Sequence, residues 1–276
     1  MAQFTAADIC VVIPTLNEAD RIHANIDHIR TFGFREIIVV DGGSTDGTDL
    51  VAAAIPGVTL VRAEQGRGQQ LSVGAASSTA PVLLFLHADT HLPADADQII
   101  ADTLAGKETG RETASEIGAG CFRLAFDADH WLLNLSAWLT RFETQFTTFG
   151  DQAFFMRRDV LEAAGGVPKI PLFEDVVLRR KLKRAGRFRK ADAAVITSAR
   201  RFGQLGVLRT QLWNAAILAA FALGVTPHRL ASIYKRRAQQ TVQTAKTGIR
   251  PQPGTPAQTK ALPATAPEGL GSSHIP

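Results

Sequence analysis

The chain has 276 residues, of which 45% are hydrophobic and 20% are charged, and its formal net charge is +4. This balance is typical of a globular protein and excludes a wholly disordered chain, a coiled coil and a collagen-like fibre. The mild positive charge suits an anionic ligand or an acidic membrane surface without identifying either. Cys10 and Cys121 are too few for a disulfide scaffold or a cysteine-based zinc site, and their apolar neighbours predict buried, reduced thiols.

The first hundred residues alternate between strand and helix signals. Short apolar runs predict buried parallel strands at residues 9–14, 37–40, 58–61 and 82–86. Helical spacing or helix-capping residues predict helices at 18–32, from about 48 to 54, and at 68–76. Such alternation favours βαβ units and a mostly parallel sheet.

The pattern loosens after residue 102. Strands are predicted at 117–126, 153–156 and 193–197, and helices at 130–142, 175–184, 205–223 and 227–237. Residues 239–276 have hardly any large apolar side chains, which predicts a disordered tail after a single α/β domain over residues 1–238. The opening residues do not have the pattern of a secretory signal, and no apolar run reaches 18 residues, so we expect neither a signal nor a transmembrane helix.

Polar segments follow three of the predicted strands, at residues 15–18, 41–48 and 87–89. The carboxyl ends of parallel strands lie at one edge of a sheet, so we expect these segments to meet at a ligand crevice there. Asp41 is expected to point into the crevice, where its carboxylate suits a ribose hydroxyl or a base N–H. A glycine-rich turn with a helix cap is the equally weighted structural alternative. The segment matches neither a Walker loop, a dinucleotide fingerprint nor an EF-hand.

Several charged residues have two open interpretations each. Asp89 follows an apolar strand, so it suits a divalent cation held together with a diphosphate, or a helix cap. The acidic pair at residues 174–175 precedes a helix, where it favours the helix dipole or supplies a general base. The segment at 150–152 is a turn or a hydroxyl-binding pair. The basic run at 179–190 indicates a solvated helix face rather than a nucleic-acid site, and the arginine pair at 200–201 suits a diphosphate.

The ordered motifs together are more specific than any one of them. VIPTLNEA at residues 12–19, VVDGGSTDGT at 39–48 and FLHAD at 85–89 resemble family 2 glycosyltransferases with the GT-A fold. GDQ at 150–152 and FED at 173–175 resemble a bacterial subgroup, the transferases associated with radical-SAM and selenodomain genes. The resemblance covers roughly residues 8–237 and implies a nucleotide-binding half at about 8–105, an acceptor-side half at about 106–204 and C-terminal helices at 205–238.

The resemblance implies an inverting, metal-assisted transfer of a sugar from a nucleoside-diphosphate sugar, with UDP as the expected nucleotide. Asp175 would be the general base, and Asp89 the ligand of a divalent cation, Mg²⁺ or Mn²⁺, with no organic cofactor. The other implied roles are nucleotide binding by Thr15, Glu18, Asp41, Arg67 and Asp89, diphosphate binding by Arg201, and acceptor binding by Asp151, Gln152 and Glu174. His87 stands where the family's metal motif has its first Asp, which weakens the case for a metal.

The acceptor is not evident from the residues. The apolar segment at 205–223, with basic residues near both ends, predicts an interfacial helix on an anionic membrane, or a core helix or dimer contact. An interfacial helix would favour a lipid or isoprenoid-like acceptor and a place at the inner face of the cell membrane; otherwise the protein is expected to be cytoplasmic. A homo-oligomer is compatible with the sequence, and no nucleic-acid partner is expected. The rival interpretations are a sugar-phosphate nucleotidyltransferase and a non-catalytic nucleotide-sugar-binding homologue.

Overall fold

The computed structural model describes residues 4–108, 111–112, 116–144, 146–200, 202 and 206–234. An eight-stranded sheet forms the centre, with the strand order β3-β2-β1-β4-β9-β8-β10-β5. Its elements in the first half of the chain are η1 (Ala6–Asp8), β1 (Ile9–Thr15), α1 (Ala19–Arg30), β2 (Glu36–Asp41), α2 (Thr48–Ala54), β3 (Val58–Arg62), α3 (Arg67–Ala76), β4 (Val82–Phe85), β5 (Thr90–His91) and α4 (Ala96–Leu104).

The second half supplies the remaining strands and helices. Its elements are β6 (Lys107–Glu108), β7 (Arg111–Glu112), β8 (Ala119–Phe126), α5 (Trp131–Leu139), η2 (Gly150–Gln152), β9 (Phe154–Arg157), α6 (Arg158–Ala163), α7 (Glu174–Ala185), β10 (Phe188–Thr197) and α9 (Val207–Ala222). Residues 227–234 are also helical. The sequence predicted every strand of the sheet except β5, and it missed the short helix α6.

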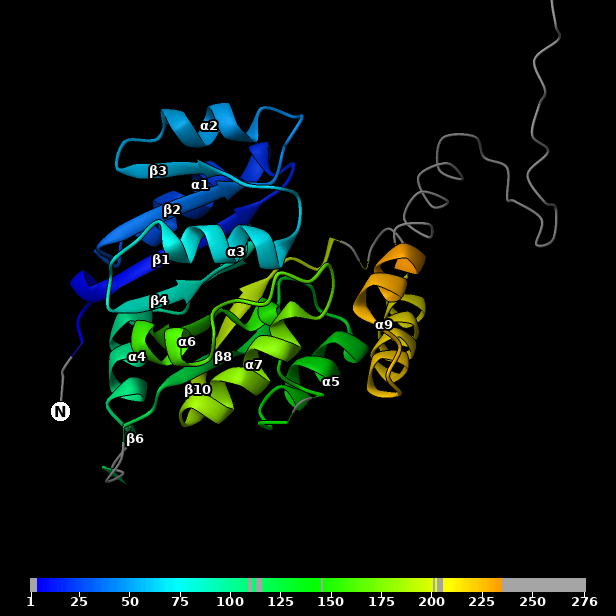
Figure 1. The fold of residues 1–276 in the computed structure, drawn as a ribbon. Helices are drawn as coiled ribbons and strands as arrows, with labels where there is room; N and C mark the ends of the chain where they lie inside the picture. The colour runs from blue at the N-terminus through cyan, green and yellow to red at the C-terminus, as the bar shows by residue number, and fades with distance from the viewer. Residues whose placement is uncertain are drawn as a thin grey trace, which may run out of the picture. The chain divides into compact units, whose positions relative to one another are not determined.

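Buried β-branched and leucine side chains on both faces of the sheet produce three layers. On one face, β1 side chains such as Ile9 and Val11 pack with α1, α2 and α4. On the other face, Cys10 and Val12 pack with α3, α6 and α7, the helices in front of the sheet in Figure 1. A Cβ on Gly74 would lie 2.3 Å from Val12 Cγ1, so a glycine lets α3 approach β1 closely.

The sheet is parallel where β1 pairs with β2 and β4, where β2 pairs with β3, and where β8 pairs with β10. Strand β9 is antiparallel to both β4 and β8, and β5 is antiparallel to the end of β10. The predicted mostly parallel α/β fold is therefore confirmed. Because β4 is parallel to β1, and β9 is antiparallel to β4, the loop after β4 and the turn η2 before β9 lie at the same edge as the carboxyl ends of β1 and β2.

Candidate functional site

The loops after β1 and β2 are joined by side-chain-to-backbone hydrogen bonds. The Asn17 N–H donates to Ser44 Oγ (2.9 Å), and the Thr45 N–H donates to Asn17 Oδ1 (2.9 Å). The Glu18 N–H donates to Thr48 Oγ1 (2.8 Å). Asn17 has a positive φ of 57°, a conformation that asparagine tolerates better than most residues. The predicted convergence of these two segments is confirmed.

Asp41 shapes its own loop from a buried position. Its Oδ2 accepts the N–H groups of Gly43 (2.9 Å) and Ser44 (3.0 Å), and its Oδ1 accepts the Ser44 hydroxyl. A carboxylate has about four lone-pair sites, so about one remains for a ligand. These hydrogen bonds confirm the structural turn, and the nucleotide contact of Asp41 stays a prediction.

Gln70 is a residue of this edge that the sequence reasoning did not single out. Its side chain is buried, and Nε2 donates to the carbonyl oxygens of Thr15 and Val40, both at 2.8 Å. These two hydrogen bonds connect α3 to the ends of β1 and β2. Thr15 is also buried. In the sequence, the only indication of this role is that a polar amide stands between Gly68 and Leu71, two positions that pack closely in α3.

Arg200 joins the third predicted segment to the first. Its Nη2 forms an ion pair with Glu18 Oε1 and lies 3.4 Å from Asp89 Oδ2. The three polar segments after β1, β2 and β4 therefore meet, as predicted. Arg201, the predicted diphosphate residue, lies outside the described residues.

Arg67 is the centre of a second group of charges. Its guanidinium forms ion pairs with Glu174 Oε1 and with Asp175 Oδ2 (3.0 Å), and Nη1 lies 3.0 Å from His87 Nε2. Burial alone would lower the pKa of Arg67, but Glu174 and Asp175 raise it above its usual range. Arg67 was predicted at the nucleotide; the structure places it between carboxylates that come more than a hundred residues later.

Glu174 and Asp175 open α7, and both are buried. Phe173, just before them, has a positive φ of 62°, and its ring stacks on Phe221 of α9 with 4.5 Å between centroids. The Gly150 N–H donates to Asp175 Oδ2 (2.7 Å), which brings η2 to the same place. Gly150, Glu174 and Asp175 line a pocket together with Arg67, Leu71, Phe85, His87, Phe154 and Leu178.

Asp151 and Gln152 differ in their surroundings. Gln152 is fully buried, and its Nε2 donates to the Thr147 carbonyl (2.8 Å). Asp151 is partly buried, and its Oδ1 is shielded from solvent without a hydrogen-bond partner. Burial raises the pKa of Asp151 to about 6; Arg67 opposes the shift, while Asp175 and Asp89 add to it. The predicted acceptor roles of both residues, and of Glu174, stay predictions.

The residues of this edge offer few metal ligands. Among the residues that the structure describes, no group of three or more His, Cys, Asp or Glu side chains is placed to hold a metal ion. Asp89 is a single carboxylate, so the donor set fits a cation that is held mainly by ligand oxygens. Cys10 and Cys121 are buried as predicted, and burial raises the pKa of each thiol to about 12, so neither is a thiolate at neutral pH.

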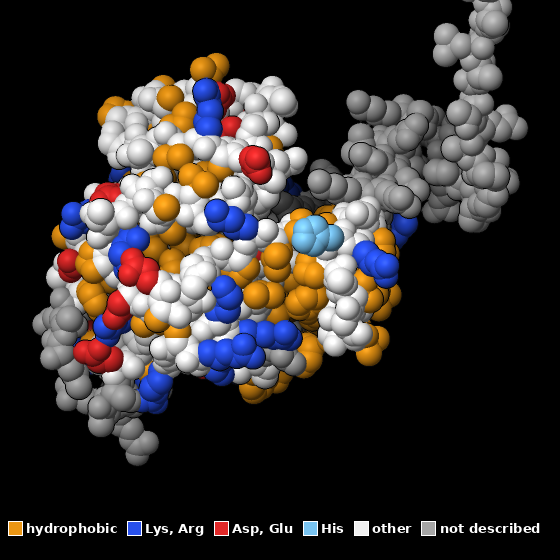
Figure 2. All heavy atoms as spheres, in the orientation of Figure 1, with side chains coloured by type: hydrophobic (Ala, Val, Ile, Leu, Met, Phe, Trp, Pro, Cys, Tyr) orange, Lys and Arg blue, Asp and Glu red, His pale blue; other side chains and the backbone are white. Residues whose placement is uncertain are grey.

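Large apolar side chains are exposed on α5, on the segment after it, and on α9. They are Trp131, Leu135, Trp138, Leu139, Phe142, Phe146, Leu208 and Leu212. Gln211 of α9 donates to Ser136 of α5, so the two helices are neighbours. Figure 2 shows hydrophobic side chains between α7 and α9, beside basic side chains over α7. None of the described helices is long and apolar enough to cross a membrane.

The first part of the chain is similar in sequence to known proteins. Residues 10–112 match the family model described as glycosyl transferase family 2. Glycosyltransferase AglJ of Haloferax volcanii is 32% identical over 136 residues, which are 44% of this chain and 45% of that protein. Glucosyl-3-phosphoglycerate synthase of Mycolicibacterium paratuberculosis is 36% identical over 93 residues, 29% of this chain and 28% of that one. The chain spans less than half the length of these curated relatives.

Solved structures extend the likeness of fold to most of the chain. A mannosyltransferase from Pyrobaculum calidifontis, in complex with GDP-Man and Mn²⁺, has a TM-score of 0.52 at 21% identity, over 85% of this chain and 80% of that one. Glucosyl-3-phosphoglycerate synthase from Mycobacterium tuberculosis, in complex with Mn²⁺, UDP and glucosyl-3-phosphoglycerate, also has a TM-score of 0.52 at 21% identity, over 80% and 83%. At this identity they show a shared GT-A fold.

Proposed function

The chain contains a glycosyltransferase family 2 domain, and on that premise we propose that it transfers a sugar from a nucleoside-diphosphate sugar to an acceptor, with inversion at the anomeric carbon. The observation that carries this proposal is the meeting of the loops after β1, β2 and β4 beside the charges of Arg67, Glu174 and Asp175. An open α/β sheet binds its ligand at such an edge. The subgroup associated with radical-SAM and selenodomain genes stays a prediction.

The donor is expected to lie across the loops after β1 and β2. Thr15, Glu18 and Asp41 would line the base and ribose, with UDP as the expected nucleotide. The diphosphate would then extend toward Asp89 and Arg200, whose guanidinium already lies 3.4 Å from the Asp89 carboxylate. Arginine matches phosphate geometry well, so Arg200 takes up the role that the sequence gave to its neighbour Arg201.

A divalent cation fits this arrangement if the diphosphate completes its ligand shell. Asp89 would hold it, as Mg²⁺ sites often combine one or two carboxylates with substrate phosphates. When bound, the cation would stabilise the negative charge of the leaving diphosphate. His87 is turned to Arg67 by a 3.0 Å contact, so we do not count it among the ligands.

The chain's own residues would handle the acceptor and its proton. An acceptor hydroxyl or carboxylate oxygen attacks the anomeric carbon as the bond to the diphosphate breaks, and attack from the opposite side inverts the configuration. A hydroxyl needs a carboxylate that takes its proton. Asp175, which the resemblance indicates, and Asp151 are the two aspartates beside Arg67.

We propose further that the acceptor is a lipid or isoprenoid-like molecule reached at a membrane surface. The exposed apolar side chains of α5 and α9 support this proposal. The Phe173–Phe221 stack supports it as well, because it joins α9 to the start of α7. Aromatic side chains are typical of protein surfaces that lie in the membrane interface.

Calorimetric titration tests the donor site. UDP, GDP and their glucose and mannose conjugates are titrated into the full chain, each with and without Mn²⁺. We expect one nucleotide to bind with Mn²⁺ and to lose most of its affinity in Asp89→Asn. Asp192→Asn, at an exposed carboxylate of β10, is the matched control and should bind as the unaltered chain does. No binding of any of these compounds would overturn the proposal.

A further inference from the structure

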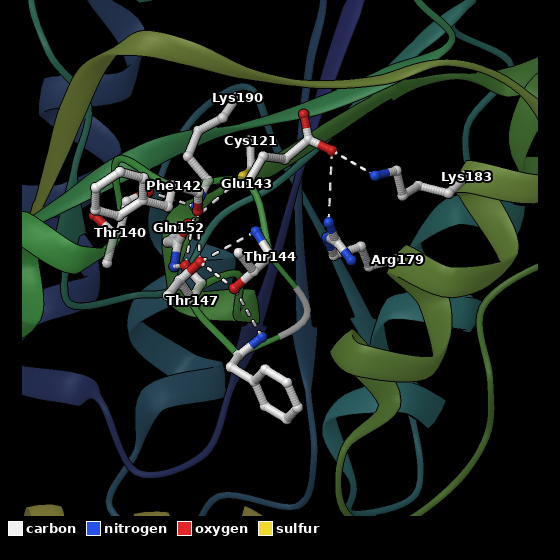
Figure 3. Close-up of polar contacts among 11 residues, drawn as sticks. Cys121, Thr140, Phe142, Glu143, Thr144, Thr147, Gln152, Arg179, Lys183 and Lys190 are labelled. Atoms are coloured by element: carbon white, nitrogen blue, oxygen red, sulfur yellow. Dashed lines mark hydrogen bonds and ion pairs between the residues drawn. The ribbon is translucent and has the colours of Figure 1, made fainter. Parts of the chain in front are cut away.

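The segment between α5 and η2 is held by a lysine of β10, as Figure 3 shows. Lys190 donates from Nζ to the carbonyl oxygens of Thr140 (2.5 Å), Phe142 (3.1 Å) and Thr147 (2.9 Å). A lysine ammonium has three N–H donors, so these three carbonyl oxygens satisfy all of them. Burial lowers the pKa of Lys190, and the carbonyl oxygens offset part of the lost solvation of its charge.

The same segment is also held from α7, which corrects the interpretation of the basic run at residues 179–190 as a solvated helix face. Arg179 is buried and Lys190 is partly buried. Glu143 of the segment pairs with Lys183 (2.8 Å) and with Arg179 (3.5 Å). Basic side chains of α7 and of β10 therefore hold the segment from two neighbouring elements.

The Thr147 carbonyl connects this segment to η2. It accepts from Lys190 Nζ and also from Nε2 of Gln152 (2.8 Å), the fully buried last residue of η2. A carbonyl oxygen has two lone pairs, so these two donors use both of them. Oε1 of Gln152 accepts in turn from Cys121 Sγ of β8 (3.6 Å). Both ends of the Gln152 amide are therefore engaged by the fold.

The first residue of η2 lies against the charged centre of the pocket. The Gly150 N–H donates to Asp175 Oδ2 (2.7 Å). A Cβ on Gly150 would lie 2.9 Å from Nη2 of Arg67, so the turn packs directly on the guanidinium that pairs with Glu174 and Asp175. A displacement of η2 would therefore change the hydrogen bond to Asp175 and the packing of Arg67 together.

These contacts form one route from β10 to the pocket. Lys190 holds the Thr147 carbonyl, which holds the Gln152 amide, and Gln152 ends the turn that Gly150 begins. Lys190, Thr147 and Gln152 are partly or fully buried, so water competes little for these hydrogen bonds. Catalysis is sensitive to such positions, because a displacement of about 1 Å can lower a rate by about 10²-fold.

We infer that Lys190 is a positioning residue: through the Thr147 carbonyl and Gln152 it sets the place of η2, and with it the Gly150 N–H that holds Asp175. The inference rests on the proposed transferase function, for which the resemblance indicates Asp175 as the general base. The donor is expected across the loops after β1 and β2, and Lys190 holds a different segment. Loss of Lys190 should therefore lower the rate of turnover and leave donor binding unaltered.

Lys190→Met tests this role, and Lys181→Met is the matched control, because Lys181 donates to the Gly165 carbonyl over a longer distance (3.4 Å). The full chain is incubated with Mn²⁺ and UDP- or GDP-linked glucose or mannose, with water as the acceptor, and nucleotide release is followed. We expect Lys190→Met to lower kcat by about 10–10²-fold, as for a misplaced reacting group, with the calorimetric Kd of the donor unaltered. Lys190→Arg should recover part of kcat, because a guanidinium also donates to carbonyl oxygens. Lys181→Met should keep the unaltered kcat.

A double-mutant cycle tests the route. Gln152→Leu removes the amide link to the Thr147 carbonyl while Lys190 remains, so this variant should also lower kcat at an unaltered donor Kd. If both side chains act through that carbonyl, the double variant should lose about as much as the larger single loss. Losses in kcat that multiply in the double variant would show independent effects and would overturn the assignment.

Circular dichroism establishes that each variant is folded, and if Lys190→Met does not fold, Lys190→Arg and Gln152→Leu carry the test. An unaltered kcat in Lys190→Met or in Gln152→Leu would contradict the assignment. So would a donor Kd that weakens as much as kcat falls. If the unaltered chain binds no donor or releases no nucleotide, the proposed transfer itself fails, a result distinct from turnover that does not depend on Lys190.

Discussion

On the β1–β2 side of the site, polar groups satisfy one another: Asn17, Ser44 and Thr48 exchange hydrogen bonds with backbone groups of the neighbouring loop. On the α3–α7 side, Arg67 shares its charge between Glu174 and Asp175, and Asp151 keeps a carboxylate oxygen without a partner. The first side gains stability from its loops, while the second carries an electrostatic cost. Such unsatisfied groups are expected where a protein performs chemistry rather than where it only folds.

The largest effect on stability is expected from the charged side. Arg67→Met leaves the buried Glu174 and Asp175 carboxylates without their cation, so we expect the free energy of unfolding to fall by about 3 kcal/mol. Arg62→Met is the control, because Arg62 forms an exposed pair with Asp49 that should contribute about 0–1 kcal/mol. Urea denaturation measures both. Equal losses in the two variants would remove the contrast between a buried centre of charge and a surface pair.

The next effect has the opposite sign. Folding raises the pKa of Asp151 to about 6 from 3.8, so its ionised form destabilises the fold once the pH rises through this range. Asp151→Asn should therefore raise the free energy of unfolding on the order of 2 kcal/mol above pH 6, and the gain should disappear below pH about 4. Denaturation at pH 4 and pH 7.5 checks this. A variant that is less stable at pH 7.5 would show that Asp151 supports the fold.

A smaller loss of stability is expected on the β1–β2 side of the site. Asn17→Ala removes the acceptor for the Thr45 N–H and places alanine at a φ of 57°, so we expect a loss of about 1–2 kcal/mol. Asn17→Gly removes the same hydrogen bond but accepts this φ, and should cost less. Thermal unfolding distinguishes them. If Asn17→Ala and Asn17→Gly lower the free energy of unfolding equally, backbone strain at position 17 does not contribute to the loss.

The smallest effect on stability is expected at the apolar surface. Trp131 is 70% exposed, so Trp131→Ser should change the free energy of unfolding by no more than about 0.5 kcal/mol. If α5 and α9 contact a membrane, the same substitution should reduce co-sedimentation with vesicles of phosphatidylglycerol. An unaltered chain that does not sediment with these vesicles would contradict the membrane proposal.

The β1–β2 side of the site was the easier one to predict from the sequence. Short apolar runs ended by Thr15, Asp41 and Asp89 predict strands, and the parallel connection rule places their ends together. Periodicity gives neither the direction of β9 nor its neighbours, so the position of η2 beside α7 could not be predicted. The basic run that contains Lys190 resembles a solvated helix because charge alone does not show which residues are buried.

The charged side depends on contacts between residues far apart in the chain. Arg67 and Glu174 are joined across 107 positions, and no spacing rule connects an arginine at the start of one helix with carboxylates at the start of another. The sequence named Arg67, Asp151 and Asp175 as candidates, but the partner of each comes from tertiary structure. Arg200 and Arg201 could not be distinguished, since both follow the same strand.

Proton NMR of sugar release tests the central claim most directly. The full chain is mixed with Mn²⁺ and, in turn, UDP-α- and GDP-α-linked glucose and mannose, and the first anomer of the released sugar is recorded before mutarotation. The account predicts release from one of these donors, with the β anomer formed first, because water attacks opposite the leaving diphosphate. Release of the α anomer first, or no release from any of the four donors, would contradict inverting transfer at this edge of the sheet.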